Sequence, residues 1–281
     1  MNEVKSKYFL EDHRDAMHQR IIAYLNQLEP PIDIELPGKQ VQWLFPHRNV
    51  ETRRCIEAFY SKYYSDKRQR ILILGINPGR FGGGTTGYFL FKRKSQRLDE
   101  LLRKYLKIFL SDFFPFYLDL GVPFTDPIRL KTFCQIESNF PEKPELSAQF
   151  IYDYFLENYS LEKFNQEFFI GAVCPLGLES KGRNMNYYDN KILMKNLLEH
   201  FIPEHIQEQI DLGCSTKVAI CLGEGLNYST MEKLNKKYHF FRTLLKLPHP
   251  RYIMQYKRKQ VNDYVEKYVQ TCQVAIELTE K

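Results

Sequence analysis

Hydrophobic and polar positions divide the chain into two kinds of segment. Uninterrupted apolar runs occupy 68–76, 167–176 and 217–223, and a shorter run at 243–248 ends in a proline. Such runs are typical of strands in a parallel sheet that is covered on both faces. Apolar residues at helical spacing predict helices over six other segments, which are 8–28, 49–64, 147–159, 189–202, 225–238 and 260–278.

Strands that alternate with helices of this length imply right-handed crossovers and a central parallel sheet. We therefore expect a single α/β domain with three layers, α/β/α, around a central, mainly parallel four-stranded sheet. A helical extension is expected at the N-terminus, over about 1–48.

Residues that could take part in binding or catalysis follow the first and the last predicted strands. The first is followed by GINPGRFGGG at 75–84, and the last by HPRYIMQYKRK at 249–259. Ligands of such sheets bind at the carboxyl ends of the strands, so these segments are expected to meet. The glycine-rich segment lacks the Lys-Ser/Thr of a P-loop, and Pro78 stands where a dinucleotide-binding fold would begin its helix.

Composition indicates what kind of partner the protein binds and in which cellular compartment it works. The 281 residues are 43% hydrophobic and carry a net charge of +6, which suits a polyanionic partner. There is neither a leader pattern nor a run of about 18 apolar residues, so we expect a cytoplasmic, nucleoid-associated protein with no membrane segment. The six cysteines are scattered and form no C-x-x-C pair. This favours reduced thiols, and neither a metal nor a cofactor is expected.

Five motifs follow one another in a distinctive order. Matching positions are Gly75, Asn77, Pro78, Gly79, Phe81 and Gly82, then Thr86 and Gly87, then 122–124, then 168–176, and finally His249 with Pro250. Together they resemble the single-strand-selective monofunctional branch of the uracil-DNA glycosylase superfamily. The family pattern runs through G-M-N-P-G-P-F-G, T-G, V-P-F-G, F-F-x-x-N-x-C-P-L and H-P. Tyr252 and the GRNMNYYD segment at 182–189 look closer to a bacterial sub-branch than to the animal enzymes.

The resemblance implies a monofunctional DNA glycosylase of base-excision repair. Such an enzyme hydrolyses the N-glycosidic bond of uracil, or of a related deaminated base, after the nucleotide has flipped out of the DNA. Asn77 would hold the attacking water through its carbonyl oxygen. His249 would donate to the oxyanion that develops on the departing base. The implied base-binding positions are Gly75, Ile76, Gly79, Phe81, Phe124, which would stack on the base, and Ala172.

The segment after His249 is expected to form a basic loop that contacts DNA. Its apolar residues suit a wedge that fills the gap left by a flipped nucleotide; they are Tyr252, Ile253, Met254 and Tyr256. The partner is expected to be single- or double-stranded DNA, bound by a monomer. The implied DNA-binding positions are Gly82, Arg251, Tyr252, Lys257, Arg258 and Lys259.

Two features depart from the family pattern. Ala172, or at best Gly171, stands where the family has an asparagine that reads the edge of uracil. The pocket is therefore expected to admit other deaminated bases, such as xanthine and hypoxanthine. Asn184 or Asn186 is a candidate substitute for that amide. Residues 88–120 separate two motifs that adjoin in the family, and an amphipathic pattern at 95–113 predicts an inserted helical excursion. Its basic residues, Lys92, Arg93, Lys94 and Arg97, are expected to reach the DNA backbone.

Two other functions stay open at this point. The first is a non-catalytic nucleic-acid-binding relative that the excursion has inactivated, and the second is a nucleotide-processing enzyme of the same fold. Taken singly, an asparagine before Pro-Gly is typical of a turn, and a lone histidine is more often structural than catalytic.

Overall fold

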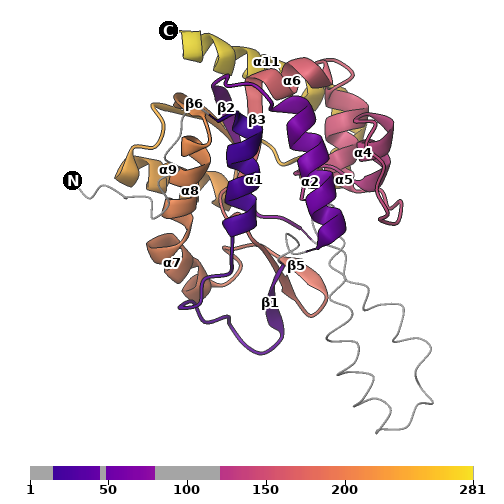
Figure 1. The fold of residues 1–281 in the computed structure, drawn as a ribbon. Helices are drawn as coiled ribbons and strands as arrows, with labels where there is room; N and C mark the ends of the chain where they lie inside the picture. The colour runs from indigo at the N-terminus through magenta and orange to yellow at the C-terminus, as the bar shows by residue number, and fades with distance from the viewer. Residues whose placement is uncertain (1–14, 45–48, 80–120, 281) are drawn as a thin grey trace, which may run out of the picture.

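The computed structural model of the protein describes residues 15–44, 49–79 and 121–280 (Figure 1). Several expectations lie outside the described residues. They are residues 8–14 of the helix expected at 8–28, the positions of Phe81, Gly82, Thr86 and Gly87, and the whole excursion at 88–120. The expected boundaries of the N-terminal extension and of the excursion stay predictions.

The four predicted strands form one parallel sheet, which confirms the expected α/β/α class. They are β2 (Arg70–Gly75), β3 (Phe168–Ala172), β6 (Cys214–Leu222) and β7 (Thr243–Leu247), in the spatial order β3-β2-β6-β7. Every neighbouring pair is parallel. The strand β2 is buried along its whole length because helices cover the sheet on both faces.

Helices form the outer layers. In Figure 1, α1 (Met17–Gln27) and α8 (Ile202–Asp211) stand in front of the sheet, and α11 (Val261–Glu280) lies behind it. The remaining helical elements are α2 (Val50–Tyr63), α4 (Pro127–Thr132), α5 (Leu146–Phe150), the π-helix η3 (Ile151–Phe155), α6 (Leu161–Glu167), α7 (Lys191–His200), α9 (Leu226–Tyr238), α10 (Pro250–Tyr256) and the 3₁₀-helix η4 (Arg258–Gln260).

Local chemistry explains where the helices begin. The Asn49 side chain accepts hydrogen bonds from the main-chain nitrogens of Glu51 and Thr52, at 2.9 and 3.1 Å, and so caps α2 as its sequence predicts. The helix predicted over 147–159 is instead α5 followed by η3, and the one predicted over 189–202 ends at His200. Phe201 leaves the helical conformation there, and Pro203 then opens α8.

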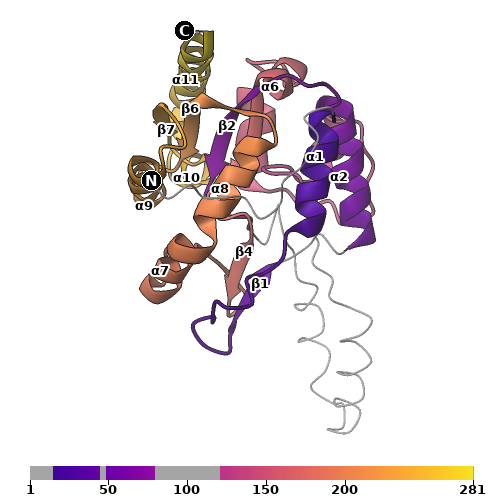
Figure 2. The ribbon, with the colours of Figure 1, turned by 60° about the vertical axis from the view of Figure 1, so that its left-hand side comes forward.

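A second, antiparallel sheet was not predicted. It consists of β1 (Val41–Leu44), β4 (Gly177–Ser180) and β5 (Arg183–Met185), in the order β1-β4-β5. Figure 2 shows β1 and β4 below the main sheet. Because β4 and β5 form a hairpin, the segment expected to be an open strand exit after β3 turns back toward the end of β2.

Candidate active site

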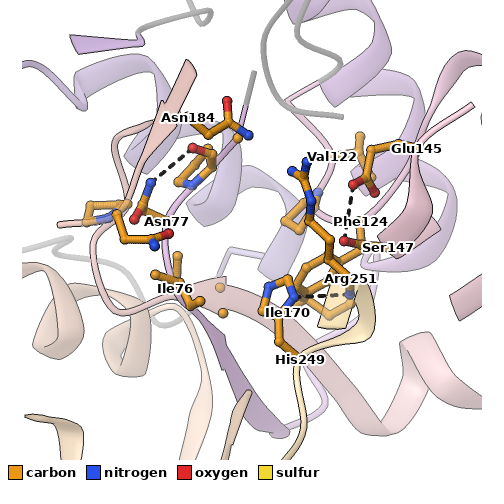
Figure 3. A pocket seen from close by; sticks show the side chains of 18 of the residues that line it. Ile76, Asn77, Val122, Phe124, Glu145, Ser147, Ile170, Asn184, His249 and Arg251 are labelled. Carbon is orange, nitrogen blue, oxygen red and sulfur yellow. Dashed lines mark hydrogen bonds between the residues drawn. The ribbon is translucent and has the colours of Figure 1, made fainter. Parts of the chain in front are cut away.

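The ends of the parallel strands meet around one cavity of about 640 Å³. In the sheet register Gly75 pairs with Ala172, and His249 follows β7 by two residues, so the predicted strand exits do converge. Nine of the predicted site residues line the cavity: Gly75, Ile76, Asn77, Gly79, Phe124, Ala172, His249, Arg251 and Tyr252. Figure 3 labels Ile76, Asn77, Phe124, His249 and Arg251 among them. Lys257, Arg258 and Lys259 are not among the described lining residues, and Phe81 and Gly82 lie outside the described residues.

The side chain of Asn77 is fixed by main-chain groups of the β5 segment. Its Oδ1 accepts from the nitrogen of Tyr187 at 3.1 Å, and its Nδ2 donates to the oxygens of Met185 and Pro78, each at 3.2 Å. Both amide hydrogens are therefore used, which defines which end of the carboxamide is oxygen. Oδ1 keeps a second lone pair, so Asn77 can accept a hydrogen bond from a water but has no hydrogen left to donate.

A buried network supports this arrangement from below. The hydroxyl of Tyr187 donates to Oδ1 of Asn227 at 2.9 Å, and Nδ2 of Asn227 donates to the oxygen of Leu222 at 2.8 Å. The same Nδ2 lies 3.4 Å from the oxygen of Gly75, at the end of β2. The turns after β2, β5 and β6 are thus connected through side chains, and Asn77 is positioned by the fold as a whole.

His249 caps α10 and has a defined tautomer. Its Nδ1 accepts from the main-chain nitrogen of Arg251 at 3.2 Å, so the proton of a neutral ring resides on Nε2. Burial of the ring, together with the nearby charge of Arg251, lowers the pKa of His249 to about 4. At neutral pH this residue is an uncharged imidazole that offers one N–H donor.

Phe124 forms an aromatic wall beside His249. Its ring meets the His249 ring edge-on at a centroid distance of 5.5 Å. A Cβ on Gly75 would stand 3.3 Å from Cζ of Phe124, so glycine lets the ring approach the end of β2. The main chain of Phe124 has φ of 50°, which is uncommon for a bulky residue and is found mainly where the surrounding fold imposes it.

The opposite wall carries polar groups that the sequence motifs did not indicate. Figure 3 shows Glu145 and Ser147 on the far side of Phe124 from Asn77. The Glu145 carboxylate caps α5, accepting from the nitrogen of Ala148 at 2.9 Å and from the Ser147 hydroxyl at 3.2 Å. Burial raises the pKa of Glu145, although its hydrogen bonds and Arg251 act in the other direction. A carboxyl group therefore belongs to the pocket wall.

The hairpin and α8 supply the remaining polar side chains. Arg183, Asn184 and Asn186 line the cavity from the hairpin, so both asparagines proposed as substitutes for the missing amide reach it. Nδ2 of Asn184 would lie 2.8 Å from a Cβ on Gly79, which explains the glycine at that position. Gln209 lines the cavity from α8, and no local motif marks it because it acts through tertiary contact.

The expected basic loop after His249 is wrong, because the structure forms α10 and then η4 there. Ile253 and Met254 are buried in the core and cannot serve as a wedge. Tyr252 and Tyr256, one helical turn apart, are instead 44% and 66% exposed, and their ring centroids lie 5.6 Å apart at the edge of the cavity. Proline at the first helical position suits a helix start, so Pro250 opens α10.

Three further findings concern the whole of the described chain. Within residues 15–44, 49–79 and 121–280, no group of three or more His, Cys, Asp or Glu side chains could hold a metal ion. In the same ranges, no helix is long and apolar enough to cross a membrane. All six cysteines are buried thiols outside any disulfide.

Comparisons with known proteins place this fold and cavity among hydrolases of the uracil-DNA glycosylase type. The sequence model of the Uracil DNA glycosylase superfamily matches residues 61–273, and the chain belongs to that superfamily. Within it the chain is SMUG-like. The crystal structure of SMUG2 from Pedobacter heparinus is 34% identical in sequence, with a TM-score of 0.75, covering 92% of this chain and 97% of that one. None of the curated proteins matches the chain.

Proposed function

We propose that this protein is a monofunctional DNA glycosylase that removes uracil or a related deaminated base from DNA in base-excision repair. One observation supports the proposal: Asn77 and His249 line the same cavity, and hydrogen bonds orient the carboxamide of the first and set the tautomer of the second. The carboxamide offers an acceptor and the neutral imidazole offers a donor. Hydrolysis of a glycosidic bond needs both, one for the water and one for the leaving base.

The reaction follows from these two groups. Nε2–H of His249 donates to the carbonyl oxygen of the base, and the negative charge that forms as the C–N bond breaks is stabilised there. The sugar becomes oxocarbenium-like, and a water held by Oδ1 of Asn77 adds to its C1′ carbon. The proton that this water loses neutralises the departing base anion. The products are a free base and an abasic sugar. No lysine is found among the described residues that line the cavity, which favours water over an amine as the nucleophile.

The walls of the cavity suit a flipped base of moderate size. Phe124 would stack on it, an interaction worth about 1–3 kcal/mol. Gly75 and Gly79 let the base and sugar approach the main chain closely. Ala172 presents a methyl group in place of an amide, so the pocket is expected to take xanthine and hypoxanthine as well as uracil.

The mouth of the cavity suits DNA. Arg251 and Tyr252 stand there together with Tyr256, and exposed aromatic rings provide stacking surfaces for unpaired bases. Lys257, Arg258 and Lys259 continue the basic surface into η4. A monomer would bind DNA through this face, with the damaged nucleotide turned into the cavity.

A panel of oligonucleotides tests the proposal. Single-stranded and duplex DNA carrying uracil, xanthine or hypoxanthine is incubated with the protein, and abasic sites are scored as alkali-sensitive breaks. Breaks with the wild type and their loss in Asn77→Ala support the proposal. DNA binding without breaks would instead identify a non-catalytic relative, and the absence of both would favour an enzyme that acts on free nucleotides.

A further inference from the structure

Gln209 pairs with the peptide group of the residue that replaces the family asparagine. Ala172 ends β3, which is an edge strand of the parallel sheet. Its main-chain nitrogen donates to Oε1 of Gln209 at 3.0 Å, and its oxygen accepts from Nε2 of Gln209, also at 3.0 Å. One carboxamide thus satisfies both polar groups of one residue.

The orientation of this carboxamide is fixed by a third bond. Nε2 also donates to the oxygen of His205 at 2.9 Å, one helical turn earlier on α8. Both amide hydrogens are used, and Gln209 is only 2% exposed. A Cβ at Gly171 would lie 2.0 Å from Oε1, so the neighbouring residue must be glycine for Gln209 to enter.

Gln209, Gly171 and Ala172 line the same cavity as His249 and Phe124. With Gln209 in place, the N–H of Ala172 is already used and its carbonyl oxygen has one lone pair left, so the peptide group at 172 offers a base no donor. Without Gln209, the open strand end would expose an N–H and a C=O to the cavity. Any base with a matching edge could then pair with them.

We propose that Gln209 is a positioning residue that holds the Ala172 main chain in the pocket wall and thereby sets which bases the enzyme removes. This inference rests on the proposed glycosylase function. Position 172 lacks the carboxamide of the family asparagine. Gln209 on α8 supplies a carboxamide nearby, and it bonds to the main chain at the end of β3. Its effect on catalysis is geometric, because a small displacement of the pocket wall misaligns the base with its donor.

The first test is Gln209→Met, which preserves side-chain length and removes every hydrogen bond. Single-turnover base release is measured on uracil, xanthine and hypoxanthine oligonucleotides, and DNA affinity is measured on an abasic-site analogue. We expect rates to fall by about 10-fold or more and the ratios between bases to change, with DNA affinity unaltered. Gln207→Met is the matched control, since Gln207 bonds to Asp211 at 2.9 Å and does not line the cavity. Wild-type rates and ratios in Gln209→Met would overturn the proposal.

A second variant separates hydrogen bonding from packing. In Gln209→Glu a protonated carboxyl can accept from the Ala172 nitrogen and donate to its oxygen, whereas a carboxylate faces two carbonyl oxygens. The variant-to-wild-type rate ratio should therefore rise as pH falls, and a ratio that is flat with pH would contradict the proposal. Dividing by the wild-type rate removes titrations common to both proteins. The neighbouring ionisable groups are His205, Glu208 and Asp211 on α8, Tyr24 and Arg20 on α1, and Cys174 after β3.

Amide hydrogen exchange at Ala172 tests the hydrogen bond between its N–H and Gln209, and it requires no DNA. We expect slow exchange in the wild type and in Gln207→Met, and exchange faster by about 10-fold or more in Gln209→Met, because the protecting acceptor is gone. Fast exchange in the wild type would overturn the proposed contact while leaving the glycosylase function intact. A wild type with slow exchange that releases no base would overturn the proposed function, and with it the role in base choice.

Discussion

The carboxamide oxygen of Asn77 lies 3.1 Å from the main-chain nitrogen of Tyr187, a residue 110 positions further along the chain. This contact determines how the proposed water-binding group points. Gly75, Pro78 and Gly79 beside Asn77 indicate a turn, but the direction of the Asn77 oxygen is set by its contact with Tyr187, just after the β4–β5 hairpin. Catalytic competence should therefore depend on residues that never approach the DNA.

Replacing Asn77 should abolish most activity. Asn77→Ala removes the acceptor for the attacking water and should reduce base release by about 10²-fold, as the loss of one preorganised polar group does in other enzymes. Single-turnover kinetics on a uracil oligonucleotide measure the effect, and circular dichroism checks that the fold is retained. A folded variant with wild-type rates would refute the role of Asn77.

His249 should stay neutral across the physiological range. Its pKa in the folded protein, about 4, is below the ordinary value of 6.5, so folding favours the uncharged ring. The stability that this provides is complete above pH 6.5 and decreases as pH falls from 6.5 toward 4, because the unfolded chain binds the proton first. NMR titration of the ring should show no transition between pH 8 and pH 5.5.

The corresponding activity test uses His249→Ala. We expect base release to fall by about 10²-fold, because the variant lacks the donor to the departing base. The wild-type rate should show no inflection near pH 6.5 from this residue. An NMR transition of the His249 ring near pH 6.5 would mean that the pocket does not desolvate it.

The buried hydroxyl of Tyr187 should contribute to stability and to catalysis. Tyr187→Phe leaves Oδ1 of Asn227 without its donor, which should lower the free energy of unfolding by about 1–3 kcal/mol. Urea denaturation measures this difference. Tyr188→Phe, at the adjacent half-buried position, is the matched control and should change the free energy of unfolding by a smaller amount. Equal effects of the two substitutions would argue against the network.

The aromatic residues that line the cavity and the basic residues that follow them at η4 should affect DNA binding in different ways. Tyr252→Ala with Tyr256→Ala should weaken binding at every salt concentration, because stacking contributes about 1–3 kcal/mol per base. Replacing Lys257, Arg258 and Lys259 with Ala should instead reduce the slope of log affinity against log salt, by about 0.9 for each phosphate of duplex DNA that the protein no longer neutralises. Fluorescence anisotropy at several salt concentrations distinguishes them, and an unchanged slope in the triple variant would place those cations away from the DNA.

Long, regular patterns gave reliable predictions of the fold. The strands β2, β3, β6 and β7 were recognisable as apolar runs, because both faces of a parallel sheet are buried. The start of α2 was predictable because Asn49 is a typical helix-capping residue. The strands β1, β4 and β5 span only three or four residues each, too few for alternation to be visible. The helix α10 was not predicted, because the family pattern places a basic loop beside its H-P motif.

The site was predictable only where a motif carries the chemistry. Asn77, Phe124 and His249 stand in local patterns, and the structure brings all three to one cavity. Gln209 and Tyr187 act through contacts with residues 37 and 110 positions away, and nothing adjacent to them in the sequence signals this. Their roles depend on how α8 and the hairpin pack, which is a property of the tertiary structure.

The side chain of Gln209 fills the space that a side chain at position 171 would need, because a methyl group on Gly171 would collide with Oε1 of Gln209. Neither position can then evolve on its own. A side chain at 171 is admissible only after residue 209 has become shorter, and shortening residue 209 leaves main-chain groups unsatisfied until something else fills the gap. Such epistasis allows two alternative solutions at the end of β3, separated by intermediates of low fitness. Lineages on either side would diverge in base preference without any change in Asn77 or His249.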